Sequence, residues 1–482
     1  MKEDCIFSKL MKINSQNIII IGAGPAGLTC AYELVKNNHQ PLVLEQANLV
    51  GGISRTEVYE GYRFDIGGHR FYTKVKQIEQ LWREVLGDNF IRVSRLSRIY
   101  YQGKFFDYPL SLKSTLFNLG LIESSLIILS YLKAKLRFIV DKKEAETFED
   151  WIIHCFGERL YHTFFKTYTE KVWGIPCNLI QAEWAKQRIK GLSLKEAIIN
   201  IIFGKSNAKS LINQFDYPIL GPGMMWEAFA DAIENKGGKV QLNSKIIKIN
   251  RKSTKILSIE VEEKGEIKTI NGEHFIFSMP LTKLLNIIEP KPPENILKVA
   301  NKLNYRDFLI VALIIDAEDL FPDNWIYIHA PNFQVGRIQN FKNWSPKMVP
   351  DLTKTCLGME YFCSEGDDLW NLSNSELIKL ATKELKELGL AKYKLVEGGT
   401  VLRQKKAYPV YDKNYYQYLT IIKDYLGTFE NLQTIGRNGM HRYNNQDHSM
   451  LTGLLAAKNI LGEKHDLWEV NTERSYYEEF IK

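Results

Sequence analysis

The chain contains 482 residues, and 63 Lys and Arg against 56 Asp and Glu give it a formal net charge of +7. Hydrophobic residues make up 45% and charged residues 25%, which excludes a disordered chain, a collagen-like fibre and a disulfide scaffold. This length predicts roughly two to three domains. The mild positive charge suits an anionic small-molecule ligand, although a basic surface without a ligand explains it equally well.

The cysteines are scattered without CxxC spacing, so we expect no zinc ribbon, no dithiol redox centre, no disulfide framework and no metal site. This usage is typical of the reducing cytoplasm. The first 16 residues contain no apolar signal core, so we expect a cytoplasmic protein. The six cysteines are Cys5, Cys30, Cys155, Cys177, Cys356 and Cys363.

The first predicted element is a buried parallel strand at residues 17–21, a short apolar run rich in β-branched side chains. A glycine turn at residues 22–27 follows at once. Apolar residues at helical spacing come next, and a second apolar run occupies residues 41–45. This order indicates a β-α-β unit, with the glycine turn at the carboxyl end of a strand and the amino end of a helix.

Gly22, Gly24 and Gly27 form a GxGxxG motif in this setting, which predicts a dinucleotide-binding site. Gly22 permits the tight turn, Gly24 lets a pyrophosphate approach the backbone, and Gly27 lets the helix pack closely on the sheet. The helix N-terminus offers N–H groups and a positive dipole end to the phosphates. Glu45 ends the second strand, where its carboxylate can accept hydrogen bonds from ribose hydroxyls.

Two glycine doublets follow, which a fold that binds only NAD does not need. The doublets and the residues next to them are Gly51, Gly52 and Arg55, then Gly67, Gly68 and His69. With the GxGxxG motif they resemble the FAD-binding fingerprint of the flavoprotein superfamily that contains amine oxidases, protoporphyrinogen oxidase, carotenoid desaturases and UDP-galactopyranose mutases. The resemblance implies FAD as the cofactor. It places the first doublet beside the pyrophosphate and the second near the flavin.

Helical patterns dominate from about residue 110 to residue 213, and the longest apolar stretch of the chain lies here at residues 121–132. This stretch is too short to span a bilayer and contains Glu123. We expect an amphipathic helix packed inside a helical domain. The bases that follow, Lys133, Lys135 and Arg137, leave a helix on a membrane surface as the alternative.

Strand signals return at residues 239–250, 256–262 and 267–279, and residues 308–316 predict a core strand. Two capping boxes predict the starts of helices. They comprise Thr147–Asp150 and Ser373–Glu376, and Gly389 ends the second of these helices. Near the end of the chain, a strand into a glycine turn precedes a helix that begins at about residue 449.

The C-terminal motif resembles the closing motif of eukaryotic-type UDP-galactopyranose mutases. In that family a GRxG turn, a lysine–tyrosine pair and an NQDHS string follow in order. The resemblance implies cofactor contacts for Gly436, Arg437, Asn445, Gln446 and Ser449, and substrate binding for Tyr443.

Further segments resemble the same family along nearly the whole chain. Residues 184–188 resemble a helix with a substrate-binding arginine, here Arg188, and residues 336–346 resemble a strand that carries a second, Arg337. Residues 407–409, with Tyr408, resemble a third substrate segment. Matches are also found at residues 67–69, 100–104 and 108–109.

The resemblance implies an isomerase that converts a UDP-hexopyranose into its furanose form without net redox change, with N5 of reduced flavin as nucleophile. Arg188 and Arg337 would stabilise the departing diphosphate, because guanidinium groups stay charged and bind phosphate bidentately. They are predicted to be catalytic together with His69, and Tyr408 and Tyr443 would donate phenol hydrogen bonds.

Each assignment has a structural alternative. Arg188 lies in a basic helix that could be a solvated face, and Tyr408 could be a core aromatic residue. His69 could contact the flavin without acid–base chemistry. His441 and His448 are expected to be structural or merely near the flavin.

Two departures from the mutase pattern fall near the sugar pocket. The spacing after Tyr443 is about two residues shorter, and residues 70–73 are more polar than expected. The substrate therefore stays open, and a second hypothesis is an FAD-dependent oxidoreductase of the amine oxidase, protoporphyrinogen oxidase or desaturase type. A third is a flavoprotein that keeps FAD as a structural ligand. No second GxGxxG lies in a strand–turn–helix setting, which argues against a disulfide reductase.

The predicted fold class is α/β, with a Rossmann-like FAD-binding domain and interleaved helical and mixed-sheet substrate domains. We assign residues 15–105, 215–300 and 398–465 to the FAD domain, 106–214 to the helical domain and 301–397 to the substrate domain. Expected partners are a UDP-sugar or other small molecule and an external reductant such as NAD(P)H. We expect no nucleic-acid binding, because the sequence contains no basic stripe with interleaved aromatic residues. We also expect no stable membrane insertion. The oligomeric state stays open.

Overall fold

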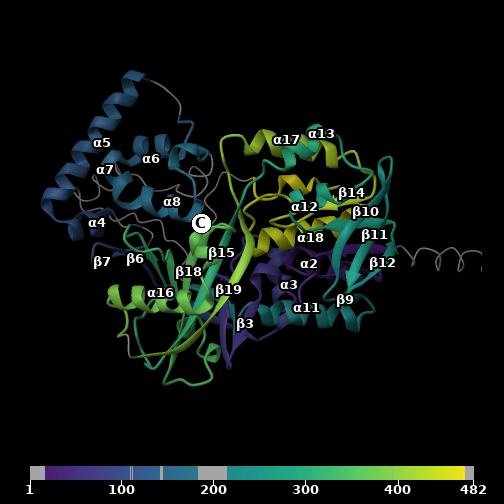
Figure 1. Cartoon of the computed structure of the whole chain (residues 1–482), viewed down its shortest axis with the longest axis horizontal. Coiled ribbons are helices and arrows are strands. Elements are labelled where there is room, and N and C mark those ends of the chain that lie inside the picture. The colour runs from purple at the N-terminus through teal and green to yellow at the C-terminus, as the bar shows by residue number, and fades with distance from the viewer. Residues whose placement is uncertain are drawn as a thin grey trace, which may run out of the picture.

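The structure, a computed structural model, describes residues 17–108, 110, 112–141, 145–182, 214–392 and 395–472. A five-stranded parallel sheet forms the dinucleotide-binding part, with strand order β20-β13-β1-β2-β9. Its strands come from distant parts of the sequence (Figure 1). They are β1 (Ile18–Ile21), β2 (Leu42–Leu44), β9 (Lys239–Gln241), β13 (His274–Phe277) and β20 (Leu432–Thr434).

Helices cover one face of this sheet. A core of buried side chains joins it to α2 (Pro25–Lys36), α3 (Lys76–Leu86), α11 (Gly223–Asn235) and α18 (Gln446–Ile460). The predicted β-α-β unit is therefore formed by β1, α2 and β2. The helix expected from about residue 449 begins earlier, at Gln446, because Asn445 takes the N-cap position and its N–H donates to Nδ1 of His448 (3.4 Å).

Two segments predicted as continuous strands each divide between two sheets. A turn at residues 242–244 separates β9 from β10 (Lys245–Lys252), and residues 272–273 separate β12 (Glu266–Asn271) from β13. The outer halves form a four-stranded sheet of order β12-β11-β10-β14, with β11 (Lys255–Glu263) and β14 (Ile288–Glu289). This sheet packs on the second face of the parallel sheet with α12 (Leu281–Asn286), α13 (Glu294–Ala300) and α17 (Tyr415–Leu426).

A seven-stranded mixed sheet faces the dinucleotide-binding part, with strand order β19-β15-β18-β17-β16-β6-β7. The predicted core strand is β15, which pairs antiparallel with β18 and β19. On one face lies α16 (Asn374–Glu387), which begins at the predicted capping box. The strands are β6 (Ser97–Tyr101), β7 (Lys104–Asp107), β15 (Tyr305–Ile315), β16 (Trp325–Ile328), β17 (Arg337–Asn340), β18 (Thr355–Cys363) and β19 (Val396–Pro409).

The helical part stands at the edge of the mixed sheet (Figure 1). It contains α4 (Leu112–Leu119), α5 (Leu121–Asp141), α6 (Phe148–Phe156), α7 (Glu158–Leu160), a π-helical turn η3 (Tyr161–Lys166) and α8 (Thr167–Trp173). The capping box at Thr147 and Asp150 starts α6 as predicted. The expectation that α5 packs inside the domain is met on one face only, because its other face is exposed. In the described part of the chain, no helix is both long and apolar enough to cross a bilayer.

Short elements complete the fold. They are η2 (Gly52–Ser54), β3 (Thr56–Tyr59), β4 (Tyr62–Asp65), β5 (Phe90–Ser94), η4 (Cys177–Leu179), β8 (Gln214–Pro218), α14 (Phe341–Trp344), η5 (Pro346–Met348), α15 (Asp368–Asn371) and η7 (Leu467–Glu469).

Candidate functional site

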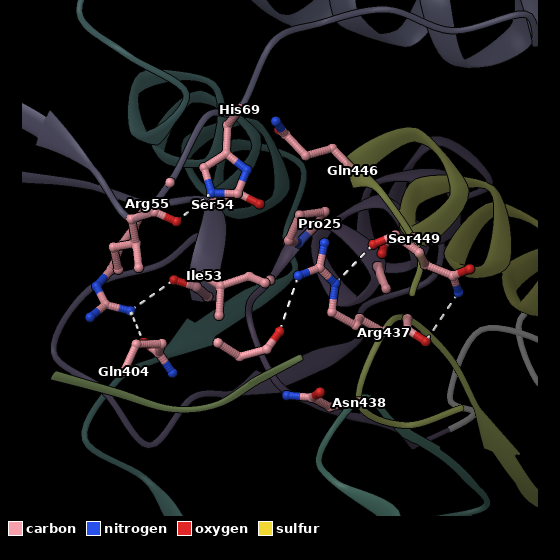
Figure 2. A pocket seen from close by; sticks show the side chains of 18 of the residues that line it. Pro25, Ile53, Ser54, Arg55, His69, Gln404, Arg437, Asn438, Gln446 and Ser449 are labelled. Carbon is pink, nitrogen blue, oxygen red and sulfur yellow. Dashed lines mark hydrogen bonds between the residues drawn. The ribbon is translucent and has the colours of Figure 1, made fainter. Parts of the chain in front are cut away.

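A cavity of about 680 Å³ lies between the parallel sheet and the mixed sheet. Segments that are distant in the sequence line it, among them the β1–α2 turn, the two glycine doublets with their neighbours, strand β17, residues 404–408 and residues of the stretch 436–449. Figure 2 shows Arg55 and Arg437 on two sides of this space, with His69, Gln446 and Pro25 around it. The GxGxxG turn, the two glycine doublets and the C-terminal motif therefore lie around one cavity.

The β1–α2 turn has the shape that a bound diphosphate requires. Gly22 has a φ of +105°, and a Cβ on Gly27 would lie 1.9 Å from the carbonyl oxygen of Gly22, so both positions demand glycine. A Cβ on Gly24, by contrast, would meet no protein atom closer than 3.9 Å. The protein itself thus leaves room at Gly24, beside the uncapped N-terminus of α2, which fits an approaching phosphate.

Glu45 lies beside this turn at the end of β2. Its Oε2 accepts a hydrogen bond from the N–H of Ala23 (2.9 Å), and its Oε1 accepts one from the N–H of Ala47 (2.9 Å). The carboxylate is therefore fixed in the cavity wall. Each oxygen keeps a lone pair that could accept a hydrogen bond from a sugar hydroxyl.

Arg55 extends along the opposite wall. Its Nε donates to Glu57 (2.5 Å), and its Nη1 donates to the carbonyl of Gly52 (2.8 Å) and to Gln404 (3.2 Å) (Figure 2). Gly51 and Gly52 both have positive φ values, +98° and +56°, which brings their backbone close to Gly24. The first doublet thus borders the phosphate-binding turn.

The second doublet carries His69 against strand β17. Nε2 of His69 donates to the carbonyl of Ile66 (3.0 Å), which leaves Nδ1 as the acceptor of a neutral ring. Burial, reinforced by Arg437 and Arg337, lowers the pKa of His69 to about 4. The histidine is therefore neutral at pH 7. A Cβ on Gly68 would lie 3.2 Å from Nε2 of Gln339, so this loop packs closely on β17.

Arg337 projects from β17 and forms an ion pair with a buried carboxylate. Its Nε donates to Oε2 of Glu360 on β18 (2.5 Å), and Nε2 of Gln339 donates to Oε1 of the same carboxylate (2.9 Å). Burial raises the pKa of Glu360, and the Arg337 charge opposes that shift. Oε1 of Gln339 is buried without a hydrogen-bond partner in the described part of the chain.

Two tyrosines and Arg437 form the adjoining wall. The rings of Tyr408 and Tyr443 stack with centroids 5.6 Å apart, and the Arg437 guanidinium lies 4.7 Å from the Tyr443 ring centre. Nε of Arg437 donates to the carbonyl of Asn444 (3.0 Å), and its Nη1 donates to that of Ala407 (3.1 Å). Burial raises the pKa of Tyr408, so its phenol stays a hydrogen-bond donor.

A second helix N-terminus reaches the cavity through the C-terminal motif. Gly436 adopts a φ of +78°, and its N–H donates to Thr452 of α18 (2.9 Å). The first turn of α18 places Asn445, Gln446 and Ser449 in the cavity lining, and Oε1 of Gln446 has no hydrogen-bond partner among the described atoms. These residues and the α2 turn together fit the diphosphate of a dinucleotide such as FAD.

The remaining candidates lie elsewhere. Arg188 falls in residues 183–213, outside the described part of the chain. His441 is buried against Tyr305 (centroids 4.7 Å apart), and neither His441 nor His448 lines the cavity. Trp325, Tyr327 and Gln339 also line the cavity and were not predicted, although the alternation along β16 and β17 points every second side chain to one face. Glu360 on β18 was not predicted either.

Comparisons with known proteins agree with this geometry. Residues 20–85 match the family described as NAD(P)-binding Rossmann-like domain. The crystal structure of reduced UDP-galactopyranose mutase superposes with a TM-score of 0.84 at 21% identity, covering 96% of this chain and 100% of that one. The chain has the fold of that mutase. The predicted fold class, the resemblance to this flavoprotein superfamily and the FAD-binding architecture are confirmed at the level of the fold.

Other relatives show how far the similarity extends. A Klebsiella pneumoniae protein named "Probable UDP-galactopyranose mutase" is 25% identical over 186 residues, which are 36% of this chain and 45% of that protein. A putrescine oxidase variant superposes with a TM-score of 0.62 at 15% identity, covering 93% and 99% of the two chains. The similarity in sequence thus spans less than half of the Klebsiella pneumoniae protein. The putrescine oxidase has the same fold as this chain.

One short homologue is more similar. A protein from Methanothermococcus thermolithotrophicus, named for its position in the nifH2 3' region, is 34% identical over 93 residues. These residues are 89% of that protein and 17% of this chain, so the chain belongs to the same family. The name of that protein states no activity.

Proposed function

We propose that the protein is an FAD-dependent mutase that converts a UDP-hexopyranose into its furanose form. The observation that carries this proposal is the pairing of Arg337 with buried Glu360, since Arg337 lines the cavity together with Tyr408 and Tyr443. An oxidase needs no fixed guanidinium and phenol pair at that place, whereas the diphosphate of a UDP-sugar does.

Four elements of the chain would hold FAD. The N-termini of α2 and α18 would bind the diphosphate, Arg55 would border it, and Glu45 would accept hydrogen bonds from the ribose. His69 and its loop would contact the flavin. Bound in its reduced form, FAD would supply a nucleophilic nitrogen for attack on the anomeric carbon of the sugar.

Arg337 would bind the leaving diphosphate. Departure of UDP places negative charge on a phosphate oxygen, and a guanidinium that never loses its proton stabilises that charge. Glu360 fixes the orientation of the guanidinium through Nε, and Nη2 lies on the side of the Gly67 loop. Tyr408 and Tyr443 would add phenol donors, and Arg188 would supply a second cation from residues 183–213.

His69 adds no positive charge near pH 7, because its pKa is lowered to about 4. A neutral ring can accept a hydrogen bond at Nδ1 without competing with Arg337 for the diphosphate. We therefore assign His69 to orienting the cofactor and the sugar, in addition to any proton transfer during ring opening.

The test uses the purified protein with bound FAD, reduced anaerobically with dithionite and mixed with UDP-galactose. Chromatography of the nucleotide sugars should show a new UDP-hexose isomer with the reduced protein only, and the oxidised protein is the control. Arg337→Ala should lose UDP binding and keep FAD. Arg98→Ala, which breaks the Arg98–Asp323 ion pair (2.6 Å) in the same sheet, should keep both.

The second candidate is an FAD-dependent oxidoreductase. It is favoured by Arg70 and Tyr72, which line the cavity where the sequence departs from the mutase pattern, and by the shared fold of the putrescine oxidase. This function would show as bleaching of oxidised flavin by an amine or an unsaturated substrate. Unchanged UDP affinity of Arg337→Ala, together with such bleaching, would replace the mutase proposal by this one.

A further inference from the structure

An exposed apolar surface runs along the helical part, far from the cavity. Eight large apolar side chains of α4 and α5 are exposed, and we call them the apolar stripe. Leu121 is 88% exposed, Phe117 87% and Leu136 66%. The members are Phe117, Leu121, Ile122, Leu126, Leu129, Leu132, Leu136 and Ile139.

The spacing of the stripe is regular. From Ile122 to Ile139 its members are three or four residues apart, so they form one continuous face of α5. With a rise of about 1.5 Å per residue, Leu121 and Ile139 lie about 27 Å apart. The opposite face meets the rest of the molecule through the buried side chains of Ile127 and Tyr131. The helix is therefore folded and anchored, and among the residues that the structure describes its outer face has no packing partner that would explain its composition.

The position of α5 leaves this face accessible. The helix lies at the outer margin of the molecule, on the side away from α2 and α18 (Figure 1). A contiguous apolar surface of this extent is rare on a protein that meets only water.

The charges around the stripe select the kind of partner. Lys133 shares the face of Leu129 and Leu136, at i+4 and i+7 spacing, and Arg137 borders it. Among the described side chains of α5, the acidic residue is Glu123 alone, and its carboxylate forms an ion pair with Arg159 (2.6 Å). The surface thus combines apolar side chains with basic ones, and its complement must be apolar and anionic.

Two occupants from the chain itself lack this complementarity. A second copy of the stripe would bring the same bases, Lys133 and Arg137, against each other. Residues 183–213, the longest internal segment outside the described ranges, contain six Lys and Arg against two Glu. Neither provides the negative charge that the stripe calls for.

We propose that the apolar stripe docks the protein on the surface of an anionic lipid bilayer. The α5 helix lies parallel to the membrane plane, with its leucines among the upper acyl chains and Lys133 and Arg137 at the lipid phosphates. The inference is independent of the reaction that the cavity performs.

The experiment is co-sedimentation of the full chain, with its FAD, and vesicles of two compositions. The protein should sediment with an equal mixture of phosphatidylcholine and phosphatidylglycerol and much less with phosphatidylcholine alone, and high salt should release it. Leu129→Ser with Leu136→Ser should lower the bound fraction about tenfold or more. Lys133→Glu with Arg137→Glu should abolish the preference for the anionic vesicles.

The matched control removes two exposed apolar side chains elsewhere. Ile267→Ser with Leu352→Ser, which are 63% and 56% exposed, should bind vesicles like the unchanged protein. Equal binding of all variants, or no binding to either vesicle, overturns the proposal. In the latter case, a dimer in sedimentation velocity that Leu129→Ser with Leu136→Ser dissolves would assign the stripe to a second copy.

Discussion

A buried carboxylate behind the cavity makes the stability of the protein depend on pH. Asp65 ends β4, two residues before Gly67, and is fully enclosed. It accepts hydrogen bonds from Thr56 Oγ1 (2.8 Å) and from the phenol of Tyr217. These bonds lower its pKa, but burial outweighs them and raises the pKa from 3.8 to about 7. Asp65→Asn keeps the shape and removes the titration.

The sign follows from the direction of the shift. The folded pKa lies above the unfolded one, so the stabilising contribution of protonated Asp65 is complete below pH 3.8 and is lost as the pH rises to about 7. The whole shift corresponds to about 4 kcal/mol, of which about 2.5 kcal/mol falls between about pH 5 and pH 8. For a chain of this size that is a change of about 2–3 °C in Tm.

The assay is thermal unfolding of both proteins at a series of pH values, each with saturating FAD. The Tm of Asp65→Asn minus that of the unchanged protein should rise by about 2–3 °C from about pH 5 to pH 8 and level off above it. The difference between the two proteins cancels the contributions of all other titrating groups. A difference that stays constant across this range would refute a raised pKa for Asp65.

Three further predictions concern the cavity. Gly27→Ala should yield protein with little bound FAD, measured by flavin absorbance, because its Cβ would lie 1.9 Å from the Gly22 carbonyl oxygen. Glu360→Gln should keep FAD but lower turnover by reduced protein about tenfold or more, since Arg337 loses its charged partner; full turnover would contradict this role of Glu360. Tyr408→Phe should weaken UDP binding about tenfold in a flavin-fluorescence titration, and unchanged affinity would place the phenol outside the diphosphate site.

The sequence predicted those elements whose conformation depends only on residues close together in the chain. The β-branched run at residues 17–21, the glycine turn after it and the two capping boxes each fix their own conformation within a few residues. The structure contains all of them. The same applies to the glycine doublets, in which Gly51, Gly52 and Gly67 have positive φ values that depend on the missing Cβ.

These local signals do not predict which strands pair when the strands are distant in the sequence. Residues 239–250 give one continuous strand signal, yet β9 pairs with β2 and β10 pairs with β11, because the chain changes direction at residues 242–244, where Asn243 has a positive φ. The buried carboxylate of Glu360 was also missed. Its role depends on β17 and β18 lying side by side, which brings Arg337 opposite it. The sequence left open whether residues 121–132 pack inside the helical domain or lie on a membrane surface, since the exposed face of α5 is a property of the assembled fold.

The two arginines of the cavity differ in how their charge is balanced, and this difference bears on the ligands. Arg337 faces a buried carboxylate, whereas the side-chain hydrogen bonds of Arg437 described above end on the carbonyl oxygens of Asn444 and Ala407. Carbonyl dipoles orient a guanidinium without neutralising it, so Arg437 leaves a positive potential beside the N-termini of α2 and α18. Arg437 is therefore suited to a permanent anion, the cofactor diphosphate. Arg337, already partly neutralised, is suited to a diphosphate that must leave after each turnover.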